Sequence, residues 1–483
     1  MSDEVYIRPL KETDAETSYR WRNDPEVWKY TGSRPDKEIT LEIEKNWIQE
    51  ILSRSDEKRF AICLRDTDEY IGNAQLTGIN SYEAEFHIFI GEKKYWGKGF
   101  GTKVTNLAVE YAFNVLKLQC VYLLVKKENV AGVRAYEKAG FEEITEDESG
   151  ILRLAKYSFD NDSRRTVSVF MMAYNHEEFI SQALDGILNQ NIDFAVEIAI
   201  GEDKSTDKTR SILLDYAQKH PNKLKLILHN KNIGANKNQI SVLNACKGKY
   251  IAYCEGDDYW TDSRKLQKQV DFLEANPDFS VCFHPVKIVY EDGNKEPQIT
   301  NANQAETTTF EDLALNNFIY TVSCVFRNNS LQFPDWFYKM PAGDYILHLL
   351  NAQYGKIGFI NEVMAVYRVH KGGVWGAKNL SELYAKWIPI VKECRRHFYP
   401  KGAEQFTKQL AKCHQQLCFA YFEANRYKDF RQNFAACIRL VRHIKGRAFF
   451  ALTIRYLLSN APVLADLYKK TLTSSKPMLD DST

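Results

Sequence analysis

The sequence has no apolar run approaching the roughly 18 consecutive residues that mark a candidate transmembrane helix, although 44% of its 483 residues are hydrophobic. We therefore expect no helix that spans a membrane. The N-terminal segment MSDEVYIRPL also lacks the basic stretch followed by an apolar one that is typical of a secretory signal peptide. The sequence thus favours a cytoplasmic location.

The ten cysteines form no CxxC pair and no Cys/His cluster with zinc spacing. This excludes the common structural zinc motifs. Several of the cysteines fall within apolar segments, as Cys63, Cys120, Cys246, Cys254 and Cys282 do. They are therefore interpreted as reduced thiols in the core of a cytosolic protein.

The chain also has almost no net charge, because its 64 Lys and Arg are nearly balanced by 63 Asp and Glu. No global field therefore indicates nucleic acid as a partner. The charge is uneven: residues 381–483 carry 18 Lys and Arg against 8 Asp and Glu. This basic region either meets an anionic surface or acceptor, or is the solvated face of a helical module.

Three segments follow one another along the chain, in line with the usual size of domains. Residues 1–160 alternate strand and helix patterns, with strands predicted in 60–91 and 120–126 and helices at 99–116 and 131–140. The polar stretch DNDSRR (160–165) is a plausible linker to a second segment, 166–378. Residues 379–483 are predicted to be helical throughout. The predicted class is thus α/β with a C-terminal all-helical region.

The second segment alternates regularly between strands and helices, which predicts a mainly parallel sheet. Its polar clusters, 175–178, 202–203 and 255–258, each follow a predicted strand. Ligands bind at the carboxyl ends of such strands, so we expect a site there. The helix at 205–220 is predicted to open with a Ser or Thr cap.

The C-terminal segment contains a helix–turn–helix pattern with its turn near Asn425 and Arg426. It loosely resembles one tetratricopeptide unit. The stretch RLVRHIKGRAFFALTIRYLL (439–458) is basic and amphipathic. It is a candidate for peripheral contact with a membrane, although packing against a core or partner is the preferred alternative.

A glycine-rich loop, YWGKGFGTKV, lies between a predicted strand and a predicted helix in the first segment. Its spacing fits neither the phosphate loop of nucleotide triphosphatases nor the dinucleotide fingerprint. What remains is a nest of backbone N–H groups at a helix N-terminus, which suits a pyrophosphate.

This loop, together with NVAGVRAYEKAGF further on, resembles the GNAT acetyltransferases, in particular the ribosomal-protein and amino-sugar branch. The resemblance implies acetyl-CoA as cosubstrate, although Trp96 stands where many members carry Arg or Gln. The residues implied to bind the cofactor are Trp96, Gly97, Lys98, Gly99, Gly101, Thr102 and Asn129. Tyr136 is implied to protonate the departing thiolate, a suitable role for a phenol.

The base that would deprotonate the amine is left open between two residues. Glu85 and His87 are two positions apart on a predicted strand and therefore share a face. Either could act directly or through water, and both could equally be ordinary polar strand residues.

Three acidic side chains in YCEGDDYW (253–260) follow an apolar strand directly. Crowded carboxylates repel one another and are costly to bury unless a positive charge lies among them. Hard carboxylate oxygens suit magnesium or manganese. Capping of the helix predicted from about residue 262 is the structural alternative for Asp257 and Asp258.

From Val167 to about His370 the chain resembles the family 2 glycosyltransferases, which have a GT-A fold. The matching stretches are VSVFMMAYNHEEFISQALDGILNQ, EIAIGEDKSTDKT, NKNIGANKNQ, GKYIAYCEGDDYWTDSRKLQKQVDFLE, AGDYILHLL and VYRVHKGGVW. The resemblance implies a nucleotide-sugar donor, with uridine as the favoured base. The segment EGDD corresponds to the DxD motif of the family, with Glu255 in place of the first Asp.

The resemblance also assigns roles. Asp257 and His370 are expected to bind Mg²⁺ or Mn²⁺, and Asp344 is expected to be the base in an inverting displacement, with helix capping as its alternative. The residues implied to contact the nucleotide sugar are Ala173, Tyr174, Glu177, Asp203, Glu255 and Arg368. Asp258 is expected near the sugar or behind the metal ligands, and Glu202 beside Asp203.

Together these resemblances predict a bifunctional cytoplasmic enzyme that acetylates an amine and transfers a sugar. The amine is expected to belong to an amino sugar in a bacterial surface glycan or glycoprotein pathway. The acceptor would be a glycan, a lipid-linked glycan or a protein, and the inner face of the membrane is a candidate location. Acetylation of protein amines, or one domain acting only as a binding module or scaffold, are the alternatives.

Overall fold

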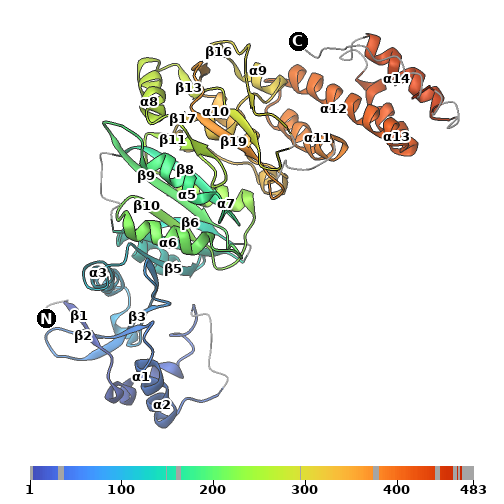
Figure 1. Cartoon of the computed structure of the whole chain (residues 1–483). Helices are drawn as coiled ribbons and strands as arrows, with labels where there is room; N and C mark the ends of the chain where they lie inside the picture. Colours follow the sequence, from blue (N-terminus) through green and yellow to red (C-terminus); the bar gives the residue numbers. More distant parts are fainter. Residues whose placement is uncertain are drawn as a thin grey trace. The chain divides into compact units, whose positions relative to one another are not determined.

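The computed structural model describes residues 4–30, 37–147, 149–158, 165–293, 295–373, 380–440 and 446–460, together with 465, 468 and 469 (Figure 1). The predicted linker at 160–165 lies almost wholly outside the described residues. The chain forms two compact units, which are residues 1–180 with 194–248, and residues 181–193 with 249–483. Within the described ranges, no helix combines the length and apolar character that crossing a bilayer would require.

The first unit contains a seven-stranded sheet with the order β1-β2-β3-β4-β5-β7-β6. Its strands are β1 (Val5–Pro9), β2 (Lys58–Leu64), β3 (Tyr70–Thr77), β4 (Glu83–Ile90), β5 (Cys120–Lys126), β6 (Glu142–Glu146) and β7 (Ile151–Tyr157). Its α-helices are α1 (Ala15–Arg22), α2 (Leu41–Leu52), α3 (Phe100–Asn114) and α4 (Val130–Lys138).

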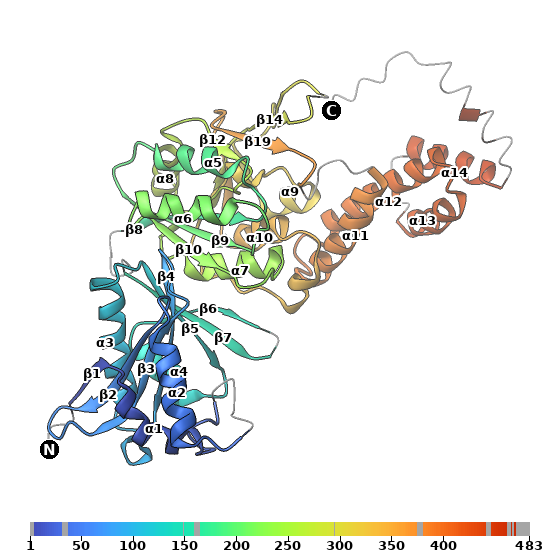
Figure 2. The same ribbon diagram turned by 60° about the horizontal axis from the view of Figure 1, so that its bottom comes forward.

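Helices cover both faces of this sheet, and strand β2 shows why. Its residue Ile62 belongs to the core that contains the apolar face of α3, whereas Ala61 and Cys63 belong to the core formed with α1 and α2. Successive side chains of a strand point to opposite faces, so the apolar run FAICL of β2 requires cover on both. Helices α1 and α2 lie side by side in Figure 2.

The same unit contains three parallel strands in the order β10-β9-β8, namely β8 (Arg165–Ala173), β9 (Ala195–Glu202) and β10 (Leu224–Leu228). Helices α6 (Thr209–Lys219) and α7 (Ala235–Ala245) alternate with them. The predicted alternation is confirmed, but the predicted Ser/Thr cap is wrong. Lys208 is the N-cap residue of α6 and makes no side-chain cap bond in the described structure. Instead, Asp207 accepts a hydrogen bond from the backbone N–H of Thr209.

Strand β10 ends this series, and its outer backbone edge is bonded by side chains of the N-terminal sheet. The Tyr82 hydroxyl donates to the carbonyl of Leu224 at 3.0 Å and accepts from the N–H of Leu226 at 2.7 Å. Arg153 donates to the carbonyl of Leu228 at 2.7 Å. A strand edge without partners exposes N–H and C=O groups that are costly to bury. The N-terminal domain therefore completes the hydrogen bonding of the second domain.

A buried ion pair supports the same contact. Arg153 lies 3.1 Å from Glu83, and both side chains are almost fully buried. The guanidinium also stacks over the Tyr122 ring at 4.0 Å. A buried pair that lost one partner would leave an uncompensated charge, which is strongly destabilising.

The second unit contains α5 (Ile180–Leu188) and two sheets. The larger group of strands has the order β11-β17-β13-β18-β16, and a smaller sheet has the order β12-β19-β14-β15. The strands are β11 (Tyr250–Tyr253), β12 (Tyr259–Trp260), β13 (Phe279–Phe283), β14 (Lys287–Tyr290), β15 (Gln298–Ile299), β16 (Thr307–Thr308), β17 (Val325–Arg327), β18 (Lys356–Phe359) and β19 (Ala365–Val369). Helices α8 (Lys265–Ala275), α9 (Phe310–Leu315) and α10 (Asp344–Ala352) accompany them.

The C-terminal region is helical, as predicted. Its helices are α11 (Leu380–His397), α12 (Ala403–Glu423), α13 (Tyr427–Arg439) and α14 (Gly446–Leu458). The predicted turn is confirmed, because α12 and α13 are separated by residues 424–426 and Asn425 has a φ of 59°. Stacked aromatic rings fill the core, with Phe434 4.7 Å from Tyr456. Of the predicted basic stretch 439–458, residues 441–445 lie outside the described structure.

Replacing Tyr82 with Phe tests the bonded edge of β10. The variant loses both hydroxyl hydrogen bonds and leaves buried backbone groups unpaired, so its free energy of unfolding should fall by about 1–3 kcal/mol. Hydrogen exchange should accelerate in the peptide that contains residues 224–228. The matched control is Tyr95→Phe, whose hydroxyl bonds Glu69 instead. Unchanged exchange in β10 would contradict the described contact.

Candidate functional sites

The glycine-rich loop turns into helix α3 through two glycines with left-handed backbone. Gly97 has a φ of 75°, and Gly99, the N-cap residue of α3, has a φ of 79°. Side chains are strained at such angles, which accounts for glycine at both positions. The N–H groups of the first turn have no partners within the helix. The loop therefore presents backbone N–H groups at which an anionic group could bind.

The other predicted cofactor residues of this loop lie around the same turn. The Trp96 indole donates to the carbonyl of Ile90 at 2.8 Å, and the Lys98 ammonium lies 5.0 Å from the centre of the Tyr95 ring. The Thr102 hydroxyl donates to a carbonyl of α4 at 3.2 Å. Gly101 occupies the first turn of α3, facing α4.

Strands β4 and β5 pair only over a short distance. Their parallel ladder joins residues 83–85 to 120–122, although β4 continues to Ile90 and β5 to Lys126. Beyond the ladder the facing edges of the two strands are not paired with one another. Backbone groups that are not paired between the two strands could bind a ligand with amide groups.

Tyr136 and Asn129 belong to the helix beside this opening. The Tyr136 ring packs edge-on to Phe86 of β4, with centroids 6.4 Å apart. Burial raises the pKa of Tyr136 to about 12, so its hydroxyl stays protonated at neutral pH. Asn129 caps helix α4 by accepting a hydrogen bond from the N–H of Gly132 at 3.1 Å. Its predicted contact with the cofactor stays a prediction.

The two candidate bases lie together, on one face of β4. The His87 imidazole is 3.5 Å from the Glu85 carboxylate and 3.0 Å from the Thr77 hydroxyl. Burial lowers the pKa of His87, which favours the neutral imidazole. The Tyr122 hydroxyl also donates to Glu85, at 3.4 Å. The choice between the two bases stays open, since either can accept a proton.

The loops that follow β8 and β9 are joined by hydrogen bonds. Asn175, in left-handed backbone, accepts from the N–H of Thr206 at 2.8 Å, and Glu177 accepts from the N–H of Lys208 at 3.0 Å. Ala173 ends β8, and Tyr174 is 44% exposed. The first two predicted polar clusters therefore meet at the carboxyl ends of the strands.

Asp203 is buried, and both of its carboxylate oxygens bind backbone. They accept from the N–H groups of Ile233 and Gly234 at 2.7 and 3.0 Å. Burial raises the pKa of Asp203, and these two bonds oppose that shift. Glu202, one residue earlier, forms an ion pair with Arg210. Asp203 thus organises the loop before α7, and its predicted contact with the nucleotide base stays a prediction.

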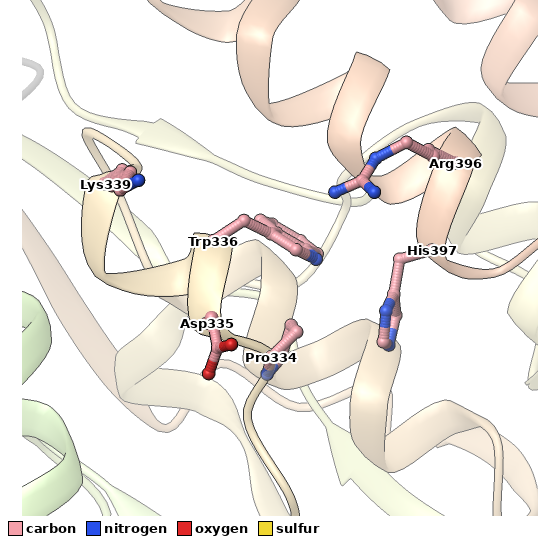
Figure 3. A pocket seen from close by; sticks show the side chains of 6 residues that line it. All are labelled: Pro334, Asp335, Trp336, Lys339, Arg396 and His397. Carbon is pink, nitrogen blue, oxygen red and sulfur yellow. The ribbon is translucent and has the colours of Figure 1, made fainter.

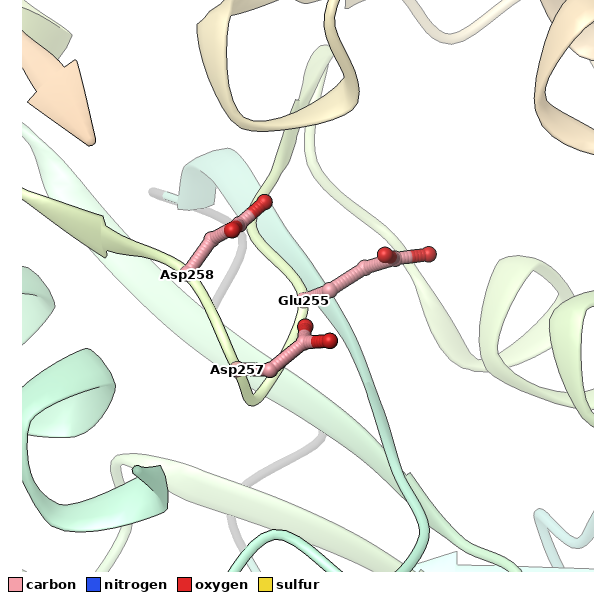
Figure 4. Close-up of side chains that lie close together, drawn as sticks. All are labelled: Glu255, Asp257 and Asp258. Atoms are coloured by element: carbon pink, nitrogen blue, oxygen red, sulfur yellow. The ribbon is translucent and has the colours of Figure 1, made fainter. Parts of the chain in front are cut away.

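The acidic loop lies in the second unit, directly after β11 (Figure 4). Glu255, Asp257 and Asp258 each offer an oxygen within 4.8 Å of the others. Burial, followed by repulsion from Asp257, raises the pKa of Glu255 to about 8. Burial and the same repulsion raise the pKa of Asp258 well above its usual range. The capping alternative is excluded, because α8 begins at Lys265 with Arg264 as its N-cap.

Asp344 is the first residue of α10, with Gly343 at the N-cap position. Its charge contributes to the raised pKa of Glu255, so the fold brings it close to the acidic loop. Burial raises the pKa of Asp344 itself, and its Oδ1 has no hydrogen-bond partner among the described residues. A carboxylate in this condition is a better proton acceptor than an exposed one.

Arg368 and His370 hold the acidic loop from β19 and the residue after it. The His370 imidazole lies 3.0 Å from the Asp257 carboxylate. Arg368 donates through its guanidinium to the carbonyl of Asp257 and through its backbone N–H to Asp258, at 2.7 and 2.8 Å. These contacts hold the acidic loop in position.

The sequence did not indicate the partners that orient Arg368. Its guanidinium also bonds Gln182, pairs with Glu291 at 3.0 Å and stacks over the Tyr259 ring at 4.4 Å. Gln182 is 186 positions away along the chain. No local pattern marks a contact of that kind.

The comparisons with known proteins divide along the same lines. The family model described as "Acetyltransferase (GNAT) domain" matches residues 4–142. The family model described as "Glycosyl transferase family 2" matches residues 168–332. Spermidine N(1)-acetyltransferase of Escherichia coli is 34% identical over 139 residues, which cover 28% of this chain and 72% of that protein. The chain joins a GNAT acetyltransferase domain to a family 2 glycosyltransferase domain.

Other relatives extend the comparison. An uncharacterized protein of Mycobacterium tuberculosis is 42% identical over 209 residues, which are 43% of this chain. The chain spans about 60% of the length of that relative. A putative teichuronic acid biosynthesis glycosyltransferase of Bacillus subtilis is 28% identical over 246 residues, covering 50% of this chain and 93% of that protein.

A solved spermidine N-acetyltransferase from Vibrio cholerae, in complex with CoA and spermine, is 25% identical. The match covers 32% of this chain and 96% of that one, with a TM-score of 0.30.

The acidic loop of the glycosyltransferase domain fits a divalent cation. Its donors are three carboxylates within one ligand sphere, and the buried Oδ2 of Asp258 has no hydrogen-bond partner in the described ranges. Hard oxygen donors of this kind are those that Mg²⁺ and Mn²⁺ prefer. A cation there would neutralise the charge that develops on a departing diphosphate.

Replacing Tyr136 with Phe tests its role in the acetyltransferase domain. If its hydroxyl protonates the thiolate, the variant should lose about 10²-fold or more in kcat for acetylation. The ring and its packing on Phe86 remain, so the affinity for acetyl-CoA should not change. Tyr111→Phe, a ring in the same domain outside the opening, is the matched control. Full kcat in Tyr136→Phe would contradict the role.

Replacing Glu255 with Gln tests the repulsion in the acidic loop. The folded-state pKa is raised from its ordinary value of 4.5 to about 8, so the metal-free protein loses stability as pH rises through that window. The variant lacks the contribution of Glu255 to that loss, whereas the contributions of Asp258 and Asp344 remain. At pH 8 and with chelator present, its Tm should exceed that of the parent chain, and the difference should shrink toward pH 5. Glu404→Gln, an exposed site, serves as the control. If Glu255→Gln had a lower Tm than the parent chain at pH 8, the predicted cost of an ionised Glu255 would be contradicted.

Proposed function

We propose that the chain is a bifunctional enzyme of bacterial surface glycan or glycoprotein synthesis. Its first domain N-acetylates an amino sugar with acetyl-CoA, and its second transfers a sugar from a nucleotide sugar, with UDP as the favoured nucleotide. The acceptor is a glycan, a lipid-linked glycan or a protein. All ten cysteines are free and buried, which fits a reducing compartment. The proposed location is the cytoplasm, with the basic helices at the inner face of the membrane.

In the proposed transfer step Asp344 accepts the proton of the acceptor hydroxyl as that oxygen attacks the anomeric carbon. The attack inverts the configuration at that carbon, and the nucleoside diphosphate leaves. Asp257 and His370 hold the divalent ion, which stabilises the diphosphate charge when bound. Arg368 keeps the acidic loop in position through the bonds described above.

In the proposed acetylation step the amine attacks the thioester carbon of acetyl-CoA. Glu85 or His87 takes the amine proton, and Tyr136 donates its proton to the sulfur of the departing coenzyme A. The glycine loop binds the pyrophosphate of the cofactor through its backbone N–H groups. Neither the acetylation nor the glycosyl transfer requires an oxidant or a further reactant.

The observation that carries the proposal is the bonded edge between the two domains in the first unit. Tyr82 and Arg153 bind the acetyltransferase sheet to β10 of the glycosyltransferase domain through buried hydrogen bonds, and Glu83 accepts a hydrogen bond from Arg153. Two transferase domains that share a buried, hydrogen-bonded contact are expected to serve one pathway. The relative named for teichuronic acid biosynthesis supports a surface glycan.

Acetylation of a polyamine is a second candidate function. It is favoured by the 34% identity to a spermidine acetyltransferase. An amino sugar and a polyamine both present a primary amine, so the acetyltransferase chemistry is the same for both. Protein amines, with a protein as the glycosyl acceptor, complete the set of substrates to be compared.

In the deciding experiment, purified protein is incubated with acetyl-CoA and an equimolar panel of nucleotide amino sugars, spermidine and lysine peptides. The acetylated products are identified by mass spectrometry. The proposal predicts that an amino sugar is acetylated with the highest kcat/KM. Acetylation of spermidine or peptides alone, with every sugar unmodified, would overturn the amino-sugar assignment.

The Asp344→Asn variant tests the second half of the proposal. Loss of the base should lower glycosyl transfer by about 10²–10⁴-fold. Acetylation should be unchanged, because Asp344 belongs to the other unit of the chain. Asp271→Asn, an exposed carboxylate of the same unit that lies outside the acidic cluster, is the matched control for transfer. Equal transfer rates in Asp344→Asn and the parent chain would refute the assigned base.

A further inference from the structure

A pocket that the proposed reactions do not use lies in the second unit (Figure 3). It has a volume of about 580 Å³ and is formed by the 3₁₀ helix η4 (Asp335–Lys339) and the last turn of α11. The lining residues are Pro334, Asp335, Trp336, Lys339, Arg396 and His397. The pocket therefore joins the glycosyltransferase domain to the first of the C-terminal helices.

Trp336 is the large apolar surface in this pocket. Its ring lies 5.6 Å from the His397 ring at an angle of 66°, so the two rings are in edge-to-face contact on the pocket wall. Its indole Nε1 is buried and has no hydrogen-bond partner in the part of the chain that the structure describes. A buried donor without an acceptor costs about 1–3 kcal/mol. The pocket thus combines a flat aromatic face with a donor that a ligand oxygen could satisfy.

The charges around Trp336 nearly cancel. Lys339 and Asp335 have opposite charges on one wall, and Arg396 on the other wall is already paired with Glu393. Burial and the neighbouring Arg396 lower the pKa of His397, which favours its neutral form. Such a pocket presents donors and acceptors together but no net charge for a strong anion or cation.

We propose that this pocket is a second saccharide-binding site, which holds an uncharged sugar ring of a glycan chain. An aromatic face with mixed donors and acceptors is the chemistry that a hydroxyl-bearing ring requires, because such a ring has apolar C–H faces and a polar edge. The ring packs on Trp336, one ring or hydroxyl oxygen accepts from its indole N–H, and hydroxyl groups meet Asp335 and Lys339. The choice of a sugar as ligand class rests on the proposed glycosyl transfer.

The position of the pocket suggests what the site does. Residues 340–343 alone separate η4 from α10, whose first residue is Asp344. A glycan bound in the pocket is therefore held by the same segment that carries the proposed base. The site would also give helix α11 a role in binding the acceptor chain.

The test follows the indole N–H signals of ¹⁵N-labelled full-length protein while methyl glycosides of common neutral hexoses are added. The chain has eight tryptophans, and Trp336→Phe identifies the signal of Trp336 by its loss. The proposal predicts that this signal alone shifts downfield and saturates, with a Kd of about 1–20 mM, as expected for one ring on one aromatic face. Saturation transfer to the glycoside should largely disappear in Trp336→Phe.

A second variant keeps the result interpretable if Trp336→Phe is unstable. Lys339→Met should retain the Trp336 signal and weaken glycoside binding several-fold, whereas Lys356→Met, an exposed lysine of the same unit, should not. Three outcomes would overturn the site: no shift of the Trp336 signal, the same shift with inorganic phosphate, or undiminished saturation transfer in Trp336→Phe. Binding without any transferase activity would instead refute the proposed function and leave the pocket assignment intact.

Discussion

Repulsion among buried carboxylates is the constraint around which the glycosyltransferase domain is built. Glu255, Asp257 and Asp258 share one turn after β11, and Asp344 adds its charge from the start of α10. Four carboxylates this close together repel one another, so their ionised forms are unfavourable unless positive charge lies among them. The protein supplies part of it through Arg368, whose guanidinium is oriented by Gln182 and Glu291. The remaining imbalance is the basis on which we propose that the loop binds a cation.

The second constraint is the outer edge of strand β10. A parallel strand at the end of a series must satisfy its free backbone groups in water, in another strand or with side chains. Here hydroxyl and guanidinium groups of the acetyltransferase sheet fulfil this role, with Tyr82 as both donor and acceptor. The fusion of the two domains is therefore structural as well as covalent. Changes at this edge are expected to affect both domains.

Local patterns in the sequence predicted much of the fold. The apolar run CVYLLVK coincides with β5, and the turn near Asn425 separates two helices as expected. The chain also showed which residues belong to the acidic loop, because an apolar strand that ends in like charges is unusual at the level of sequence alone. The prediction of a Ser or Thr cap for α6 was wrong, because Asp207 accepts the hydrogen bond from the first turn instead of a hydroxyl residue. Several residues nearby compete for such bonds, and sequence does not rank them.

Contacts between distant segments could not be predicted. Tyr82 and Leu224 are 142 positions apart, and neither belongs to a motif. Gln182 and Arg368 lie in two matching stretches 186 positions apart, but nothing in either stretch indicates that their side chains meet. The pocket between η4 and α11 has no sequence signal either. These features depend on how elements pack, which periodicity and motif spacing do not specify. The site residues taken from family resemblance keep the status of predictions until they are tested individually.

The most direct test of the central claim is a titration of Mn²⁺ followed by electron paramagnetic resonance, with and without UDP. If the acidic loop exists to hold a cation against a diphosphate, one Mn²⁺ per chain should lose its free-ion signal. UDP should tighten that binding by about tenfold or more, the equivalent of 1.4 kcal/mol or more. The Asp257→Asn variant should abolish the effect. Free Mn²⁺ at every concentration, or identical binding in the variant, would contradict the account.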